Sequence, residues 1–377
     1  MRQLSRWALA LFASAVGTSA PAADKYWVFF GTYTGGKSEG IYRSEFDPAT
    51  GAMTPAELAA KTTNPSFLAI HPTNKFLYAV GESGGGAGVT AFSLDPATGA
   101  LAKLNDQSAG GNGPCHLSVD GTGKCLVVAN YGSGSCGALP IKADGTLGKM
   151  TSFHQHAGKS VNPGNQEGPH AHSATIDAKS GFAIVADLGI DKLLVYKLNP
   201  EKALLEGGDT NFVATPPGSG PRHFAFHPTG KFAYACGEIN STILSYTYDG
   251  AGKLTPVNVA STLPGGKPVK GNSTAEVQVH PSGNFAFVSN RGHNSIAAFR
   301  IDPKTGGVTP IGHLTGGVNV PRNFAVDPTG KWIVVANQEG NDAVVFSWDA
   351  EKGEGSRIGT RIEVGKPVCV KFVPVAK

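Results

Sequence analysis

Short apolar runs separated by tight turns recur along the whole chain. Between Pro65 and Asn105 this pattern predicts four strands, at residues 66–70, 75–80, 89–94 and 101–104. The runs are rich in branched and aromatic side chains, and the turns between them hold Pro, Asn, Asp and Gly. Turns such as Asp95-Pro96-Ala97-Thr98-Gly99 suit tight connections, because proline presets one backbone angle and glycine accepts unusual ones.

The same unit repeats through the chain. Equivalent positions at the start of each first strand are spaced by 46 to 57 residues, at Pro65, Pro114, Ala171, Pro221, Thr274, Pro321 and Pro367. Four strands in about 40–50 residues is the size of a propeller blade. A unit this small cannot bury its apolar face alone and must stack on its neighbours.

The two ends of the chain complete one more blade. Residues 25–58 supply only the later strands of a blade, and residues 366–375 supply only a first strand, KPVCVKFVPV. Joining them closes a ring and removes the exposed sheet edges that invite aggregation. We therefore predict an all-β protein, a seven-bladed β-propeller whose last blade is closed by the N- and C-terminal strands.

The first residues have the pattern of a targeting segment. Arg2 and Arg6 precede an apolar run of about ten residues, and the small residues 20–23 offer a cleavage site. The run is shorter than the ~20 residues that cross a bilayer. We predict a signal peptide at 1–23, a single propeller domain at 24–377 and a periplasmic or secreted protein with no membrane span in the mature chain. An uncleaved anchor is the alternative.

Composition agrees with a turn-rich β protein and excludes some partners. The 377 residues include 51 Gly and 25 Pro, and only 16% are charged. Loss of residues 1–23 removes two arginines and lowers the formal charge from +4 to +2, which gives no support for nucleic-acid binding. The five cysteines have no regular spacing. A single disulfide among Cys115, Cys125 and Cys136 is one interpretation, but the sequence favours free cysteines that are buried as small apolar residues.

Polar residues gather in two columns of the aligned repeats. In a propeller the first strands surround the central channel, and equivalent residues form a ring at one mouth. The two positions after the start of the first strand collect His, Arg and Glu. The position after the second strand holds Glu82, Tyr131, Leu188, Glu238, Arg291 and Gln338. The resulting cluster is His116, His172, Arg222, His223, Glu238, Glu276, Arg291 and Arg322.

Two interpretations of this cluster are open. The side chains form plain ion pairs across a wet channel, Arg222 with Glu238 and Arg291 with Glu276, or they bind a ligand. Grouped arginines suit a carboxylate or phosphate, because the guanidinium group is planar, permanently charged and bidentate.

The chain resembles the seven-bladed propeller lactonase family, which includes propeller-type 6-phosphogluconolactonases and carboxymuconate cyclases. The resemblance covers nearly the whole chain after residue 23. It is carried by the motifs FGTYT, NPSFLAIHP, GPHAHSATID, GPRHFAFHPTGKFAY, TAEVQVHPSG and SNRGHNSIAAF. It implies that His172, Arg222, Glu238 and Arg291 are the catalytic residues. A typical 6-phosphogluconolactonase is cytosolic, so the export signal here argues against carrying over its phosphate specificity.

These observations predict an exported lactonase, a hydrolase of the 6-phosphogluconolactonase-like kind, that opens a sugar-acid or related carboxylate-bearing lactone. Glu238 or His172 activates water and Arg222 stabilises the oxyanion. Arg291 and Arg322 hold a substrate carboxylate, with His116, His223 and Glu276 as further substrate-binding residues. No metal or other cofactor is expected, and the small-molecule lactone is the expected partner. A lactone-forming cyclase and a non-enzymatic binding propeller are the alternatives.

Overall fold

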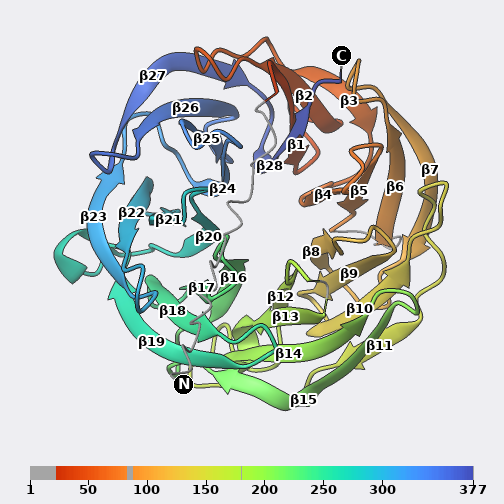
Figure 1. Cartoon of the computed structure of the whole chain (residues 1–377), viewed down its shortest axis with the longest axis vertical. Coiled ribbons are helices and arrows are strands. Elements are labelled where there is room, and N and C mark those ends of the chain that lie inside the picture. The colour runs from red at the N-terminus through yellow and green to blue at the C-terminus, as the bar shows by residue number, and fades with distance from the viewer. Residues whose placement is uncertain (1–22, 83–87, 180, 377) are drawn as a thin grey trace, which may run out of the picture.

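Seven four-stranded antiparallel sheets surround one axis in the computed structural model (Figure 1), which describes residues 23–82, 88–179 and 181–376. This confirms the predicted seven-bladed β-propeller. Of the predicted signal segment, residues 1–22 lie outside the described residues, and the domain boundary at residue 23 stays a prediction.

Six blades are each built from consecutive strands, counted from the axis outward. The first three comprise β4 (Leu68–Ile70), β5 (Phe76–Val80), β6 (Gly88–Leu94) and β7 (Leu101–Ser108); β8 (Pro114–Val119), β9 (Cys125–Asn130), β10 (Ser135–Pro140) and β11 (Ser152–Gln155); and β12 (Ala171–Ile176), β13 (Phe182–Asp187), β14 (Lys192–Asn199) and β15 (Leu204–Ala214).

The next three blades follow the same order. They comprise β16 (Pro221–Phe226), β17 (Phe232–Gly237), β18 (Thr242–Tyr248) and β19 (Leu254–Ser261); β20 (Thr274–Val279), β21 (Phe285–Asn290), β22 (Ser295–Ile301) and β23 (Val308–Leu314); and β24 (Pro321–Val326), β25 (Trp332–Asn337), β26 (Asp342–Asp349) and β27 (Glu354–Glu363). Two short 3-10 helices, η1 (Leu188–Ile190) and η2 (Pro264–Gly266), lie in connecting segments.

The seventh blade joins the two ends of the described chain, as predicted. Its order is β28 (Pro367–Pro374), β1 (Tyr26–Thr32), β2 (Gly40–Phe46) and β3 (Glu57–Lys61). Strands β1 and β28 pair antiparallel from Tyr26 opposite Pro374 onward. The C-terminal strand therefore takes the innermost place, beside the axis (Figure 1).

The core lies between neighbouring sheets. One cluster joins Ala186 and Val195 of the third consecutive blade to Phe224, Ala235 and Tyr246 of the fourth. The second strands are buried on both faces, which explains why they are continuous apolar runs rather than alternating ones.

Histidines in the first turn of three blades connect each blade to the next. They are buried, and their Nε2–H groups donate to the carbonyl oxygen of a turn glycine one blade further: His71 to Gly123, His227 to Gly283 and His280 to Gly330, at 2.8–2.9 Å. Their role in the turn was predicted, but the contact across blades was not.

Neither a membrane-crossing helix nor a disulfide is present in the described part of the chain. No helix there has the length and hydropathy to cross a bilayer. All five cysteines are buried free thiols, so the bridge left open among Cys115, Cys125 and Cys136 is absent.

Candidate active site at the channel mouth

A β-bulge at the start of β16 brings two consecutive side chains, Arg222 and His223, to one cavity. In a regular strand, neighbouring side chains point to opposite faces. The pairing of β16 with β17 shifts register between Pro221 and Phe224, and β8, β12, β20 and β24 have the same irregularity at their starts. Arg222 and His223 consequently line the same cavity.

This cavity lies at the predicted mouth of the channel. Its lining comes from six first strands or their entry segments and from one second-strand end: Ser66, Phe67, Glu82, Cys115, His172, Arg222, His223, Arg322 and Val368. The cavity is small. The centre of a water-sized sphere can move within about 10 Å³ of it, which is roughly the room that one water molecule needs.

The second predicted column is a ring of equivalent backbone positions. At six of the seven positions the N–H donates to the carbonyl of the residue just before the blade's first strand begins, and at Glu82 it donates to Asn64 O, just before the predicted strand start at Pro65, over 2.8–3.2 Å in all. The members are Tyr33, Glu82, Tyr131, Leu188, Glu238, Arg291 and Gln338. Tyr33 belongs to the blade split between the two ends, and alignment of that blade with the others would have revealed it.

Glu238 joins two of the predicted arginines. Its Oε2 lies 2.7 Å from Arg222 Nε, and its Oε1 lies 2.8 Å from Arg291 Nη2. The predicted alternative pairing of Arg291 with Glu276 is wrong. Arg291 and Glu238 both belong to the outer column at the rim, whereas Glu276 belongs to a first strand and pairs with His223.

Neighbouring charges set the protonation states of Glu238 and Arg222. Burial alone would raise the pKa of Glu238, but Arg291, Arg222 and Arg322 outweigh it and lower that pKa. Burial, assisted by Arg322 and Arg291, lowers the pKa of Arg222 to about 10. Glu238 therefore stays ionised at neutral pH and is a weak proton acceptor.

Several buried polar atoms of the same group lack a hydrogen bond among the described residues, although they are close to opposite charges. Arg222 Nε, Glu238 Oε2 and Arg291 Nε are such atoms. The 2.7 Å contact between Arg222 and Glu238 is an ion pair without hydrogen-bond alignment. Unsatisfied buried polar atoms are rare in folded proteins and mark groups that await water or a ligand.

Three predicted histidines lie close together beside the arginines. The ring centroid of His223 is 5.2 Å from that of His116 and 5.3 Å from that of His172, and Phe67 stacks 4.0 Å from His116. Burial, together with neighbouring positive charges that include Arg222, lowers the pKa of each histidine well below 6.5. All three rings are neutral at pH 7.

Glu276 lies next to these histidines and contacts His223. Its Oε2 is 2.9 Å from His223 Nδ1 and accepts a hydrogen bond from Asn323 Nδ2. Burial raises the pKa of Glu276 to about 7, although Lys371 and Arg222 act in the opposite direction. The mouth therefore brings together all eight residues of the predicted cluster, in two layers.

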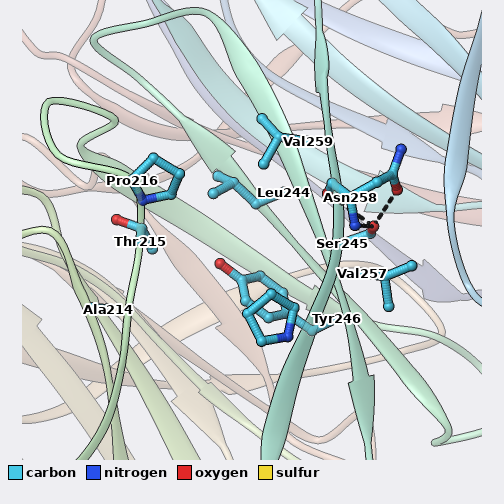
Figure 2. A pocket seen from close by; sticks show the side chains of 10 residues that line it. Ala214, Thr215, Pro216, Leu244, Ser245, Tyr246, Val257, Asn258 and Val259 are labelled. Carbon is cyan, nitrogen blue, oxygen red and sulfur yellow. Dashed lines mark hydrogen bonds between the residues drawn. The ribbon is translucent and has the colours of Figure 1, made fainter.

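A larger hollow lies on the outer side of the ring and has a different character. It has a volume of about 380 Å³ and is lined by Leu244, Tyr246 and Val259 with segment 214–216 (Figure 2). The polar contact inside it, from Ser245 Oγ to Asn258 Oδ1, is internally satisfied at 2.6 Å. Its lining contains no carboxylate, imidazole or basic group.

Comparison with known proteins identifies the family. The family described as "Lactonase, 7-bladed beta-propeller" matches residues 27–372. The chain belongs to this family. The lactonase is 37% identical to the 6-phosphogluconolactonase of Bacillus subtilis, over 93% of this chain and 99% of that protein.

Further relatives agree. A 6-phosphogluconolactonase of Formosa agariphila is 33% identical, over 89% of this lactonase and 96% of that protein. The solved structure of a periplasmic gluconolactonase from Pseudomonas aeruginosa superposes with a TM-score of 0.86 at 32% identity, covering 93% of this chain and all of that one. The prediction of a hydrolase of the lactonase class is confirmed.

Three features of the lactonase site were not predicted from the sequence. Tyr33 donates to Glu82 Oε2 over 2.8 Å, and Arg322 lies 5.3 Å over the Tyr33 ring. Lys371 lies 4.5 Å over the Phe67 ring, further along the first strand of the closing blade.

Within the described residues, no three His, Cys, Asp or Glu side chains are grouped as metal ligands.

Proposed function

We propose that this protein is an exported lactonase that opens a negatively charged sugar-acid or related lactone at the channel mouth. The observation that carries the proposal is the convergence of Arg222, Arg291 and Arg322 on one opening. Lys371 is close by, and the carboxylates beside them are Glu82, Glu238 and Glu276. With neutral histidines and an ionised Glu276, four positive and three negative groups leave a surplus of one positive charge, which favours an anionic ligand.

Arg222 is suited to stabilise the oxyanion. The side chain is only 1% exposed, and its Nη1 donates to the carbonyl oxygen of Ala275. No hydrogen bond among the described residues occupies its Nη2, and the side chain lines the cavity. A fixed donor in such a dry site contributes about 2.7–4 kcal/mol to transition-state stabilisation.

The other charged groups bind and orient. Arg291 and Arg322 hold the anionic group of the substrate, and Glu238 fixes Arg222 and Arg291 relative to each other. Because Glu238 is held ionised by these arginines, we assign it this orienting role and favour a histidine for proton transfer. His172 lines the cavity as a neutral ring, so in this proposal it donates a hydrogen bond to the leaving alkoxide while the protonated base returns the proton.

Export distinguishes the proposed substrate from that of a cytosolic enzyme. The pattern of residues 1–23 predicts a signal peptide, and one similar solved structure is a periplasmic gluconolactonase. Phosphorylated sugar acids are intracellular metabolites, so we propose a lactone without a phosphate group and expect the arginines to hold a carboxylate.

The first prediction concerns Arg222. Protein recovered from the periplasm of an expressing bacterium is assayed by acid release from gluconolactone, 6-phosphogluconolactone and a carboxylate-bearing lactone. The carboxylate-bearing compound is expected to be the best substrate. R222A is expected to lower kcat about 10²–10³-fold, since one oxyanion donor is lost.

A matched control is K304A, which removes a positive charge from an exposed turn far from the mouth and is expected to keep wild-type rates. Equal rates for wild type and an R222A/E238Q double variant would rule out the proposed roles. A wild type that opens no lactone of the panel would remove the proposed activity itself.

A further inference from the structure

The three buried histidines differ in what holds their Nδ1 atoms, and this difference decides which ring can accept a proton. His116 Nδ1 accepts the backbone N–H of Ala174 over 3.3 Å, so the neutral ring carries its hydrogen on Nε2. His172 Nδ1 lies 3.8 Å from the thiol of Cys115, a weak partner that does not fix the tautomer.

His223 has a carboxylate at this position. Its Nδ1 lies 2.9 Å from Glu276 Oε2. The same oxygen accepts an N–H from Asn323, and the Asn323 amide is oriented because its Oδ1 accepts the backbone N–H of Val370 over 2.9 Å. Three neighbouring blades thus hold the Glu276 carboxylate where it accepts the Nδ1–H of His223.

This arrangement leaves the opposite ring nitrogen as an acceptor. When Nδ1 carries the hydrogen, Nε2 has a free lone pair. No hydrogen bond to His223 Nε2 exists among the residues that the structure describes, and His223 lines the cavity beside Arg222. Of the three rings, His223 alone combines a place in the cavity lining with a carboxylate on its other nitrogen.

We propose that His223 is the general base of this lactonase and that Glu276 is the residue that positions it, an inference that rests on the proposed lactone hydrolysis. Water oxygen attacks the lactone carbonyl carbon while its proton moves to His223 Nε2. The carbon–oxygen bond of the ring ester then breaks, the leaving alkoxide takes the proton from His223, and the new carboxylic acid releases its own proton to water. The products are one hydroxy group and one carboxylate. Glu276 stabilises the imidazolium between these steps, as carboxylate–imidazole pairs do in acyl-transfer enzymes.

The surroundings set the direction of the pH dependence. The charged or titratable side chains that face His223, besides Glu276, are His116, His172, Arg222, Glu238, Arg322 and Lys371. Burial raises the pKa of Glu276 to about 7, whereas burial and Arg222 keep His223 neutral. The working form has Glu276 ionised. Its population grows as pH rises through about 7, and activity is expected to rise with it.

The second prediction tests this pair in the full-length protein with the carboxylate-bearing lactone. H223Q is expected to lower kcat about 100-fold or more with KM nearly unchanged, because a general base contributes about 10²–10⁴-fold. E276Q is expected to lower kcat about tenfold or more, since an amide cannot stabilise the imidazolium. It is also expected to abolish the rise of kcat near pH 7, a change that a merely structural role would not produce.

Gln278 provides the matched control. It lies two residues further along β20 and links to the same neighbouring blade, donating to Phe324 O over 2.7 Å and accepting from Val326 N over 3.1 Å. Q278M loses this blade contact without touching the His223–Glu276 pair. It is expected to melt at a lower temperature yet keep the pH profile and, within about twofold, the rate.

The outcomes separate the two proposals. An active wild type with an equally fast H223Q variant, or an E276Q variant that keeps the rise near pH 7, overturns the assignment and leaves the lactonase activity standing. A wild type that opens no lactone overturns both. If neither variant folds, the wild-type profile decides, because activity independent of pH between about 5 and 9 contradicts the assignment.

Discussion

His156 lies outside the cavity lining, and its contact with Asp187 supports the segment that leads to His172. Its Nδ1–H donates to Asp187 Oδ2 over 2.6 Å, and its Nε2 lies 3.0 Å from the Tyr196 hydroxyl. Asp187 Oδ1 in turn accepts the backbone N–H of His170, two residues before His172. This buried ion pair therefore fixes the segment that delivers His172 to the cavity.

The third prediction follows from the charge of His156. Burial would lower its pKa, but hydrogen bonds to Asp187 and Cys136 raise it to about 10. A raised pKa gives stability that is complete below about 6.5, the pKa of an unfolded histidine, and is lost as pH rises through the folded value. The melting temperature should therefore fall between pH 7 and pH 10, and in H156Q it should fall less. Parallel curves for both proteins would contradict this origin.

At the scale of single residues, the sequence predicted which side chains reach the channel mouth better than it predicted how far along the channel axis each of them lies. Alignment of the repeats selected Arg222, Glu238 and Arg291 because equivalent positions return to one mouth. It could not show that Arg291 pairs with Glu238 rather than Glu276. The spacing of residues along the sequence does not show how far along the channel axis each aligned position lies. This position decides which charged side chains form ion pairs.

At the scale of the element, the bulge at the start of the first strands is the feature that the pattern did not reveal. Strand alternation predicts that Arg222 and His223 point to opposite faces. The register shift in β16 places both in one cavity lining. A bulge depends on local backbone geometry, which several residue types can adopt, so composition alone does not predict it.

The fourth prediction concerns the contact that joins blades through the turn histidines. H227A removes the donor to Gly283 O and the ring that packs 5.5 Å from Phe232. A buried carbonyl without a donor costs about 1–3 kcal/mol, so the urea midpoint should fall accordingly. T229A, which removes only the local contact to His227 Nδ1, should fall much less. Equal midpoints for both variants would show that the link between blades contributes nothing.

At the scale of the whole molecule, the ring and its closure were predictable because turn residues recur at a nearly constant period. The predicted first-strand starts at Pro114, Ala171, Pro221, Thr274 and Pro321 are the observed ones. In the first consecutive blade, β4 begins at Leu68 instead of near Pro65. Closure followed from counting incomplete blades at the two ends.

The fifth prediction tests that closure. Removing residues 366–377 deletes β28 and leaves β1 without its inner partner. The exposed edge should make the chain aggregate, as size-exclusion chromatography would show. A circular permutant that joins residue 376 to residue 23 and opens the chain at Gly316 should elute as the wild type does, because Val375 N donates to Lys25 O over 3.0 Å and these two ends of the described chain are adjacent. A monomeric truncated chain with an unchanged melting temperature would contradict the prediction.

The bulge has one more consequence. The kink in β16 brings two neighbouring positions of a single strand to the same cavity. Arg222 and His223 would travel together if β16–β19 were transplanted into another ring of seven. Reaction and preference can then be altered by exchanging one modular wedge while the architecture around it is kept.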